Sequence, residues 1–97
     1  MTTARRKAYT FTLVLLGVRE LTDEVCGALY EAGCDDALPG MTEGVVFLDF
    51  TREAGSIQEA VLSAISDVER AGVGARVLRL EPAELMQMPE CVEKIKG

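Results

Sequence analysis

Residues 45–72 read VVFLDFTREAGSIQEAVLSAISDVERAG, and the other elements can be ordered around this stretch because it holds the clearest strand and helix signals of the chain. Val46, Leu48 and Phe50 are uniformly apolar and the residues between them are mixed, which predicts a strand over 45–51 whose even positions face the core. Ser56 and Glu59 have the spacing of a capping box, so we expect a helix to begin here and to end before Gly72. The expected buried stripe of this helix is Ile57, Val61, Ala64, Ile65 and Val68.

The first two elements of the chain are expected to be a strand and a helix. Residues Ala8 to Leu16 alternate with the two-residue period of a strand, and both faces are rich in apolar residues, which predicts a central strand. One face carries Tyr9, Phe11, Leu13 and Leu15, and the other carries Thr10, Thr12, Val14 and Leu16. A helix over Leu21–Ala32 follows, because Thr22 is a good N-cap and Gly33 can end a helix. Its expected stripe is Leu21, Val25, Ala28, Leu29 and Ala32.

Two shorter strands complete the pattern. One runs from about Asp36 to Met41 and belongs at a sheet edge, because Pro39 cannot donate a ladder hydrogen bond. A tight turn over Thr42 to Gly44 then leads into the strand at 45–51. The closing strand is expected over Arg76–Leu80 and ends at Pro82. In this strand we expect Leu78 and Leu80 to point inward and Val77 and Arg79 to point outward.

The order strand, helix, strand, strand, helix, strand predicts an α+β fold, namely a ferredoxin-like βαββαβ two-layer sandwich. In this arrangement both helices cover one face of a four-stranded antiparallel sheet, with the first and third strands in the centre. The 97 residues suffice for one core, so we assign residues 1–81 to a ferredoxin-like domain and residues 82–97 to a C-terminal helical tail.

The face of the sheet that the helices leave open is expected to be partly apolar. We predict that it is a protein interface formed by Val14, Val45, Phe47, Val77 and Arg79. The favoured cover is a second copy of the chain, giving a homodimer, or the chain's own C-terminal segment. A solvated sheet face with scattered apolar residues is the alternative. An RNA-binding platform is a third reading, which only Phe47 supports and which the negative charge of the chain opposes.

Residue types argue against an enzyme. The chain has no histidine, which removes imidazole metal ligands and the commonest general base near neutral pH. Cys26, Cys34 and Cys91 are an odd set without a C-x-x-C pair, so we expect neither a disulfide framework nor a zinc site. Adjacent Asp35 and Asp36 are expected to solvate a turn. We therefore predict a non-enzymatic protein with no catalytic residue, no cofactor and no metal.

Charge and hydropathy bear on partners and location. Sixteen acidic and ten basic residues give a net charge of -6, which repels nucleic acid from the domain as a whole. Arg5, Arg6 and Lys7 form a short basic stretch that we interpret as solvated. The apolar run after it, from Ala8 to Val18, is too short to span a bilayer as a helix and lacks a signal-peptidase site. We expect a cytoplasmic protein without membrane contact.

The C-terminal residues MPECVEKIKG (88–97) predict a short helix, with Pro89 in its first turn and Val92 and Ile95 buried. A tail that packs on the domain is one interpretation. These ten residues also resemble the first helix and turn glycine of a helix-turn-helix. The segments EAGCDDAL (31–38), LDFTREA (48–54) and EAVLSAISDVE (59–69) add to this likeness. Together they resemble, over roughly Tyr9 to Leu85, the N-terminal α+β module of small bacterial helix-turn-helix proteins of the DNA-binding regulator or antitoxin-like kind.

This resemblance implies a dimerisation module of a bacterial DNA-associated regulator. It also implies a recognition helix after Gly97, so contact with DNA is expected only through a missing or separate element. The alternative function is a small-molecule-sensing regulatory domain whose effector, of unknown identity, lies between protomers.

Overall fold

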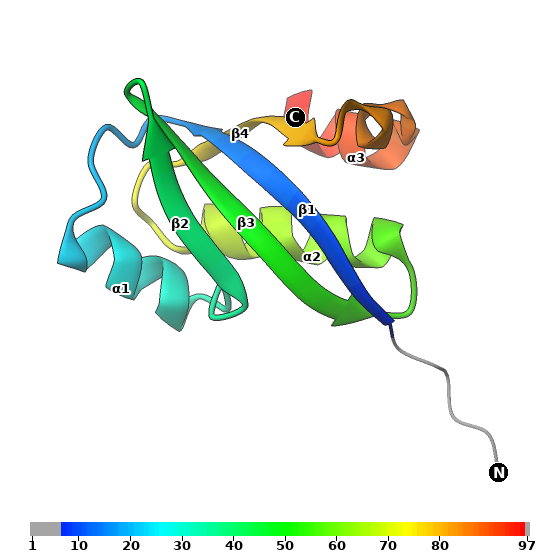
Figure 1. Ribbon diagram of the computed structural model, residues 1–97, viewed down its shortest axis with the longest axis horizontal. Coiled ribbons are helices and arrows are strands. Elements are labelled where there is room, and N and C mark those ends of the chain that lie inside the picture. Colours follow the sequence, from blue (N-terminus) through cyan, green and yellow to red (C-terminus); the bar gives the residue numbers. More distant parts are fainter. Residues whose placement is uncertain (1–6, 97) are drawn as a thin grey trace, which may run out of the picture.

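The computed structural model describes residues 7–96 and shows an α+β protein with a four-stranded antiparallel open sheet and three α-helices (Figure 1). The predictions for Arg5, Arg6 and Gly97 lie outside the described residues. The elements follow one another as β1 (Lys7–Leu16), α1 (Asp23–Glu31), β2 (Ala37–Thr42), β3 (Val45–Ala54), α2 (Ile57–Arg70), β4 (Arg76–Glu81), the 3-10 helix η1 (Ala83–Gln87) and α3 (Pro89–Lys96).

The strands are ordered β2-β3-β1-β4, which places the two ten-residue strands β1 and β3 in the centre. Leu13 lies opposite Leu48 and Phe11 lies opposite Phe50 in this central pair. Val46, Leu48 and Phe50 are fully buried, so the predicted inward positions of β3 are confirmed. The strand continues past the expected end at Thr51, because Arg52 and Ala54 extend the same inward alternation.

Helices α1 and α2 cover one face of this sheet (Figure 1), and their buried residues join those of β1 and β3 in a single core. Both predicted N-caps are confirmed. The backbone N–H of Val25 donates to the Thr22 hydroxyl, and the N–H of Glu59 donates to the Ser56 hydroxyl. The carboxylate of Glu59 in turn accepts from the N–H of Gly55, so these side-chain bonds satisfy backbone donors at the helix entrance.

A two-residue turn joins β2 to β3. Glu43 and Gly44 have φ angles of 51° and 79°, the pair of left-handed conformations that a type I′ hairpin turn requires. Thr42 and Val45 flank the turn, and alternation along the hairpin makes Pro39 and Leu48 a non-hydrogen-bonded pair. The side of Pro39 that lacks an N–H therefore faces the free edge, which is where a strand tolerates proline.

Strand β4 differs from the prediction at Val77. The register shifts between Val14, which lies opposite Arg79, and Leu15, which lies opposite Val77, so Leu78 is an extra residue in a β-bulge. As a result Val77 is only 5% exposed and belongs to the core, whereas Leu78 is 41% exposed on the open face. The predicted orientations of Val77 and Leu78 were wrong, because strict alternation does not hold across a bulge.

The C-terminal segment packs on the domain. Helix α3 contacts α2, β4 and η1, and Cys91 is completely buried in the core. Val92 and Ile95 are half-buried, so the expected burial of this pair needs correction. The inward stripe is Met88, Cys91 and Ile95, which share one helix face by their spacing. None of the helices within residues 7–96 has the length and apolar character needed to cross a membrane.

Candidate interaction surface on the open face of the sheet

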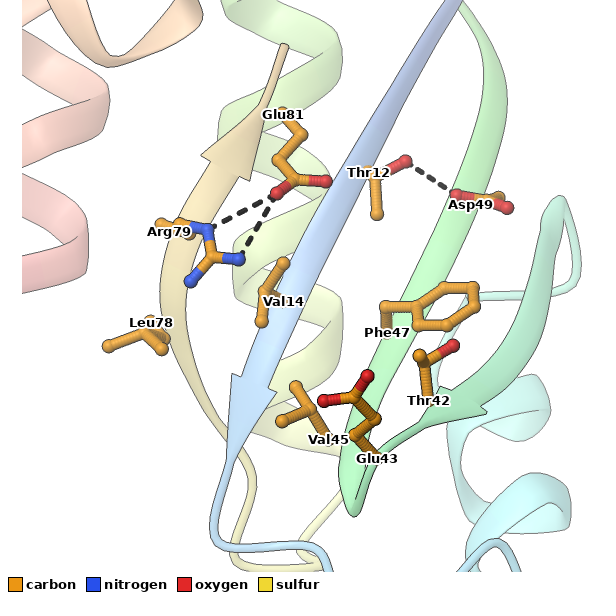
Figure 2. Close-up of a pocket in the computed structure, with 10 residues that line it drawn as sticks. All are labelled: Thr12, Val14, Thr42, Glu43, Val45, Phe47, Asp49, Leu78, Arg79 and Glu81. Atoms are coloured by element: carbon orange, nitrogen blue, oxygen red, sulfur yellow. Dashed lines mark hydrogen bonds and ion pairs between the residues drawn. The ribbon is translucent and has the colours of Figure 1, made fainter. Parts of the chain in front are cut away.

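The open face contains a hollow of about 490 Å³ (Figure 2). All four strands and the β2–β3 turn contribute its lining, which consists of Thr12, Val14, Thr42, Glu43, Val45, Phe47, Asp49, Leu78, Arg79 and Glu81. Because successive residues of a strand point to opposite faces, these side chains lie on the side of the sheet away from α1 and α2.

Four of the five residues predicted for the interface lie at this hollow: Val14, Val45, Phe47 and Arg79. Val77 does not, and Leu78 occupies the place expected for it. We call Val14, Val45, Phe47 and Leu78 the open-face patch. Val45 and Leu78 are 42% and 41% exposed, whereas Val14 is only 4% exposed because its neighbours on both sides enclose it.

Phe47 packs against a neighbouring strand of the sheet and also lines the hollow on the open face. A Cβ atom added to Gly40 would lie 2.4 Å from Cζ of the Phe47 ring, so the ring lies directly over this glycine of the neighbouring strand. Such aromatic cover of an edge-strand glycine stabilises strand pairing. Substitution of Phe47 therefore perturbs both the surface and the β2–β3 pair, which makes Val45 and Leu78 cleaner probes of the open-face patch.

Four polar residues of the hollow form two pairs within the sheet (Figure 2). The hydroxyl of Thr12 donates to Oδ1 of Asp49, and the guanidinium of Arg79 lies 3.2 Å from Oε2 of Glu81. Asp49 and Arg79 thus have separate partners and do not pair with each other. Strand β1 separates β3 from β4, and residues two strands apart lie about 10 Å from each other at the backbone.

The opposite face holds a buried charged cluster that sequence reasoning missed. Arg52 is 8% exposed and donates two hydrogen bonds to Asp36, of 2.7 and 2.9 Å. It also donates to the Ser63 hydroxyl and the Gly33 carbonyl, and it lies 3.0 Å from Oδ2 of Asp67. Its even position in β3 places it beneath the helices, which is a usable sequence signal.

The arrangement around Arg52 is structural. Its bonds join the end of α1, the start of β2 and the middle of α2. Burial alone would lower the pKa of Arg52, but the hydrogen bonds and charges of Asp36 and Asp67 outweigh it and raise that pKa. The guanidinium stays charged and its donors are used within the chain. Asp36, expected only to solvate a turn, is thus half of an ion pair.

The thiols are not arranged for nucleophilic chemistry. Burial, with a smaller contribution from the charge of Asp67, raises the pKa of the Cys34 thiol to about 11. Burial also raises the pKa of Cys91, and Glu90 adds to this effect. Cys26 is partly exposed. Among residues 7–96 no group of three or more Cys, Asp or Glu side chains is placed to hold a metal ion.

Comparisons with protein-family models, with curated proteins and with solved structures find no match for this chain. Its function is therefore argued from the geometry of the sheet.

Proposed function

We propose that this chain is a non-enzymatic interaction module that forms a homodimer through the open face of its sheet, as the dimerisation module of a bacterial DNA-associated regulator. The proposal that the chain dimerises rests on one observation. The sheet has helices on one face only, and its other face presents Val45, Phe47 and Leu78 around a hollow. A contiguous apolar patch rimmed by charges is typical of a protein contact site.

Dimerisation by the face is favoured over pairing of strand edges. On β2, Pro39 removes a donor from the free edge. On β4, the bulge at Leu78 interrupts the regular ladder. Both devices are known to protect sheet edges against pairing with another chain. The surface that remains for a second copy is the open face.

The size of the face argues for a modest affinity. With strands about 4.8 Å apart and about 3.3 Å per residue, the four strands cover about 500 Å² in projection. A standard interface buries about 800 Å² of accessible surface on each partner, and accessible surface exceeds projected area because side chains protrude. We therefore expect a dimer at the small end of specific interfaces, with a dissociation constant in the micromolar range.

Sedimentation velocity over a range of concentrations tests this proposal. The wild type is expected to approach twice the 10.5 kDa mass of one chain. Val45→Lys and Leu78→Lys are expected to remain monomeric, because each buries a lysine in the contact. Tyr30→Lys is the matched control, since Tyr30 is an exposed apolar residue on α1. A wild type that stays monomeric at millimolar concentration, or dimers unaffected by both lysine variants, would contradict the proposal.

The place of the module in a regulator rests on the resemblance of its C-terminal residues to a helix-turn-helix. We further propose the ferredoxin-like fold for it, which the order β2-β3-β1-β4 and the common side of α1 and α2 support. A reducing cytoplasm is the proposed location, and three free cysteines suit it.

Direct DNA binding is not part of the proposed role. The net charge of -6 opposes phosphate contact, and the recognition element that the resemblance implies would follow Gly97. In a gel-shift titration with random-sequence duplexes at physiological salt, this chain is expected to leave the duplex unshifted at micromolar protein. A shift of the duplex by these 97 residues alone would remove the regulator-module assignment.

The hollow supports a second candidate function, the sensing of a small molecule between protomers. Its volume lies within the range of ligand sites, and its lining combines apolar residues with Thr12, Thr42, Arg79 and three carboxylates. The excess of carboxylates favours molecules that carry an amine. Thermal unfolding with and without each of the common amino acids and nucleotides tests this function, because a ligand of the folded state raises Tm. Unchanged Tm at millimolar ligand across both sets would eliminate it.

A further inference from the structure

The two sides of the open face carry net charges of opposite sign. Its β4 side carries Arg76 and Arg79 together with Glu81, and therefore has a net positive charge. Its β2–β3 side carries Glu43 in the turn and Asp49 on β3. The two halves of one surface thus have opposite signs, which is the pattern expected of a surface that meets itself about a two-fold axis.

Arg76 and Glu43 belong to one level of the sheet. Arg76 lies opposite Leu16, and the last β1–β3 pair, Leu15 with Val46, directly adjoins Leu16 and Val45. Val45 lies opposite Thr42, and Glu43 follows Thr42 in the turn. Within residues 7–96, neither Arg76 nor Glu43 lies within 4.0 Å of an oppositely charged group, so both charges remain available to another molecule.

We infer that two copies stack face to face about a two-fold axis parallel to the strands, with Arg76 of each protomer against Glu43 of its partner. This inference rests on the proposed function. Rotation about such an axis exchanges the left and right sides of the sheet but keeps each residue at its level along the strands. The β4 side of each copy then covers the β2–β3 side of the other, and opposite charges meet twice.

A two-fold axis perpendicular to the strands gives a less favourable electrostatic result. It would place β4 over β4 and the acidic β2–β3 side over its own equivalent. Arg76 would then face the partner's Glu81, but Arg79 would face the partner's Arg79 and Glu43 would face the partner's Asp49. Like charges set against each other across an interface are unfavourable, so this orientation is selected against.

One kind of like-charge contact, formed twice by the symmetry, remains in the inferred dimer. Glu81 and Asp49 lie at the level of Thr12 on opposite sides of the sheet, so Glu81 faces the partner's Asp49. Arg79 already binds Glu81 through Nε and Nη2, and its guanidinium retains further N–H donors for the partner's Asp49. Arg79 can therefore bridge the two carboxylates, which explains an arginine at this position better than a solvated side chain does.

A charge exchange between Arg76 and Glu43 tests the orientation. The three variants are Arg76→Glu, Glu43→Arg and the double variant that carries both changes. All alter exposed side chains, so the fold is expected to persist, and circular dichroism melting verifies it. Glu31→Arg is the control for net charge, because Glu31 is exposed on α1 and lies away from the open face.

In sedimentation velocity at low salt, each single variant is expected to weaken the dimer about tenfold, since two attractive pairs become repulsive. The double variant is expected to return to within about twofold of the wild type, and 1 M salt is expected to abolish the differences by screening. Glu43→Arg that strengthens the dimer, or a double variant as weak as Arg76→Glu, would overturn the orientation. A wild type without any dimer would instead overturn the proposed function.

Discussion

The two faces of this sheet are built from the same strands, yet their charged side chains differ in burial and in pairing. On the helix side, Leu13, Leu48 and Phe50 are fully buried, and Arg52 beside them is surrounded by partners from three other elements. On the open side, Val45 and Leu78 remain exposed, and Arg76 and Glu43 are left for another molecule. The contrast indicates that the helix side stabilises the chain, and the open side is the one through which we propose that it associates. Four measurements test whether the two faces differ in this way.

The largest expected effect is that of Arg52→Ala. The substitution leaves the carboxylates of Asp36 and Asp67 side by side without their shared cation and removes the guanidinium that lies 5.0 Å from the Phe50 ring. We expect a loss of about 3–5 kcal/mol in the free energy of unfolding, measured by urea denaturation. Arg70→Ala is the control, since Arg70 also binds Asp67 but is exposed, and we expect a loss below about 1 kcal/mol. Equal losses in the two variants would show that burial of Arg52 is unimportant.

The next effect compares two positions on opposite faces of β3. Leu48→Ala creates a cavity beneath the helices and is expected to cost about 2–4 kcal/mol. Val45→Ala removes a half-exposed side chain on the other face and is expected to cost at most about 0.5 kcal/mol in a monomeric sample. Urea denaturation at low protein concentration measures both. If the two losses are similar, the faces do not differ in the way described.

The third effect is a dependence of stability on pH. The pKa of Cys34 is raised in the folded state to about 11, from the ordinary value of 9.0. Its contribution is therefore fully present below pH 9 and is lost as the pH rises toward 11, because the unfolded chain releases this proton first. We expect the stability of the wild type relative to Cys34→Ala to fall by about 2–3 kcal/mol over this range. A difference that is independent of pH would show that the Cys34 thiol ionises as easily in the folded protein as in the unfolded chain.

The smallest effect concerns the start of α2. Ser56→Ala removes the acceptor for the N–H of Glu59 and is expected to cost about 1 kcal/mol. Ser66→Ala, within the same helix, is the matched control and is expected to change stability by less than about 0.5 kcal/mol, since alanine is the better helix former. Thermal unfolding of both variants gives the comparison, and an equal loss at Ser66 would show that the cap contributes nothing particular.

Local pattern was sufficient for most of the fold. The alternation of Val46, Leu48 and Phe50 correctly predicted which face of β3 lies under the helices. Thr22 and Ser56 correctly predicted where α1 and α2 begin, because a cap acts through residues only three positions away. Pro39 placed β2 at an edge for an equally local reason, the missing N–H.

Two features of the candidate site could not be obtained from the same reasoning. Val77, Leu78 and Leu80 are all apolar, so the pattern in β4 fits more than one orientation, and the pairing with Val14 and Leu15 decides it through a bulge. The environment of Arg52 depends on Asp36 and Asp67, which lie 16 and 15 positions away in the chain and reach it only after the helices dock.

Local sequence patterns were enough to predict the strands, the N-caps of α1 and α2 and the side of β3 that is buried, because periodicity and capping act between residues a few positions apart. Three features are visible only in the folded chain: Leu78 and not Val77 completes the open-face patch, Arg52 is buried with its partners, and Arg76 and Glu43 share one level of the sheet. These features depend on pairing and packing between distant segments, and the free energy that selects them is absent until the segments meet.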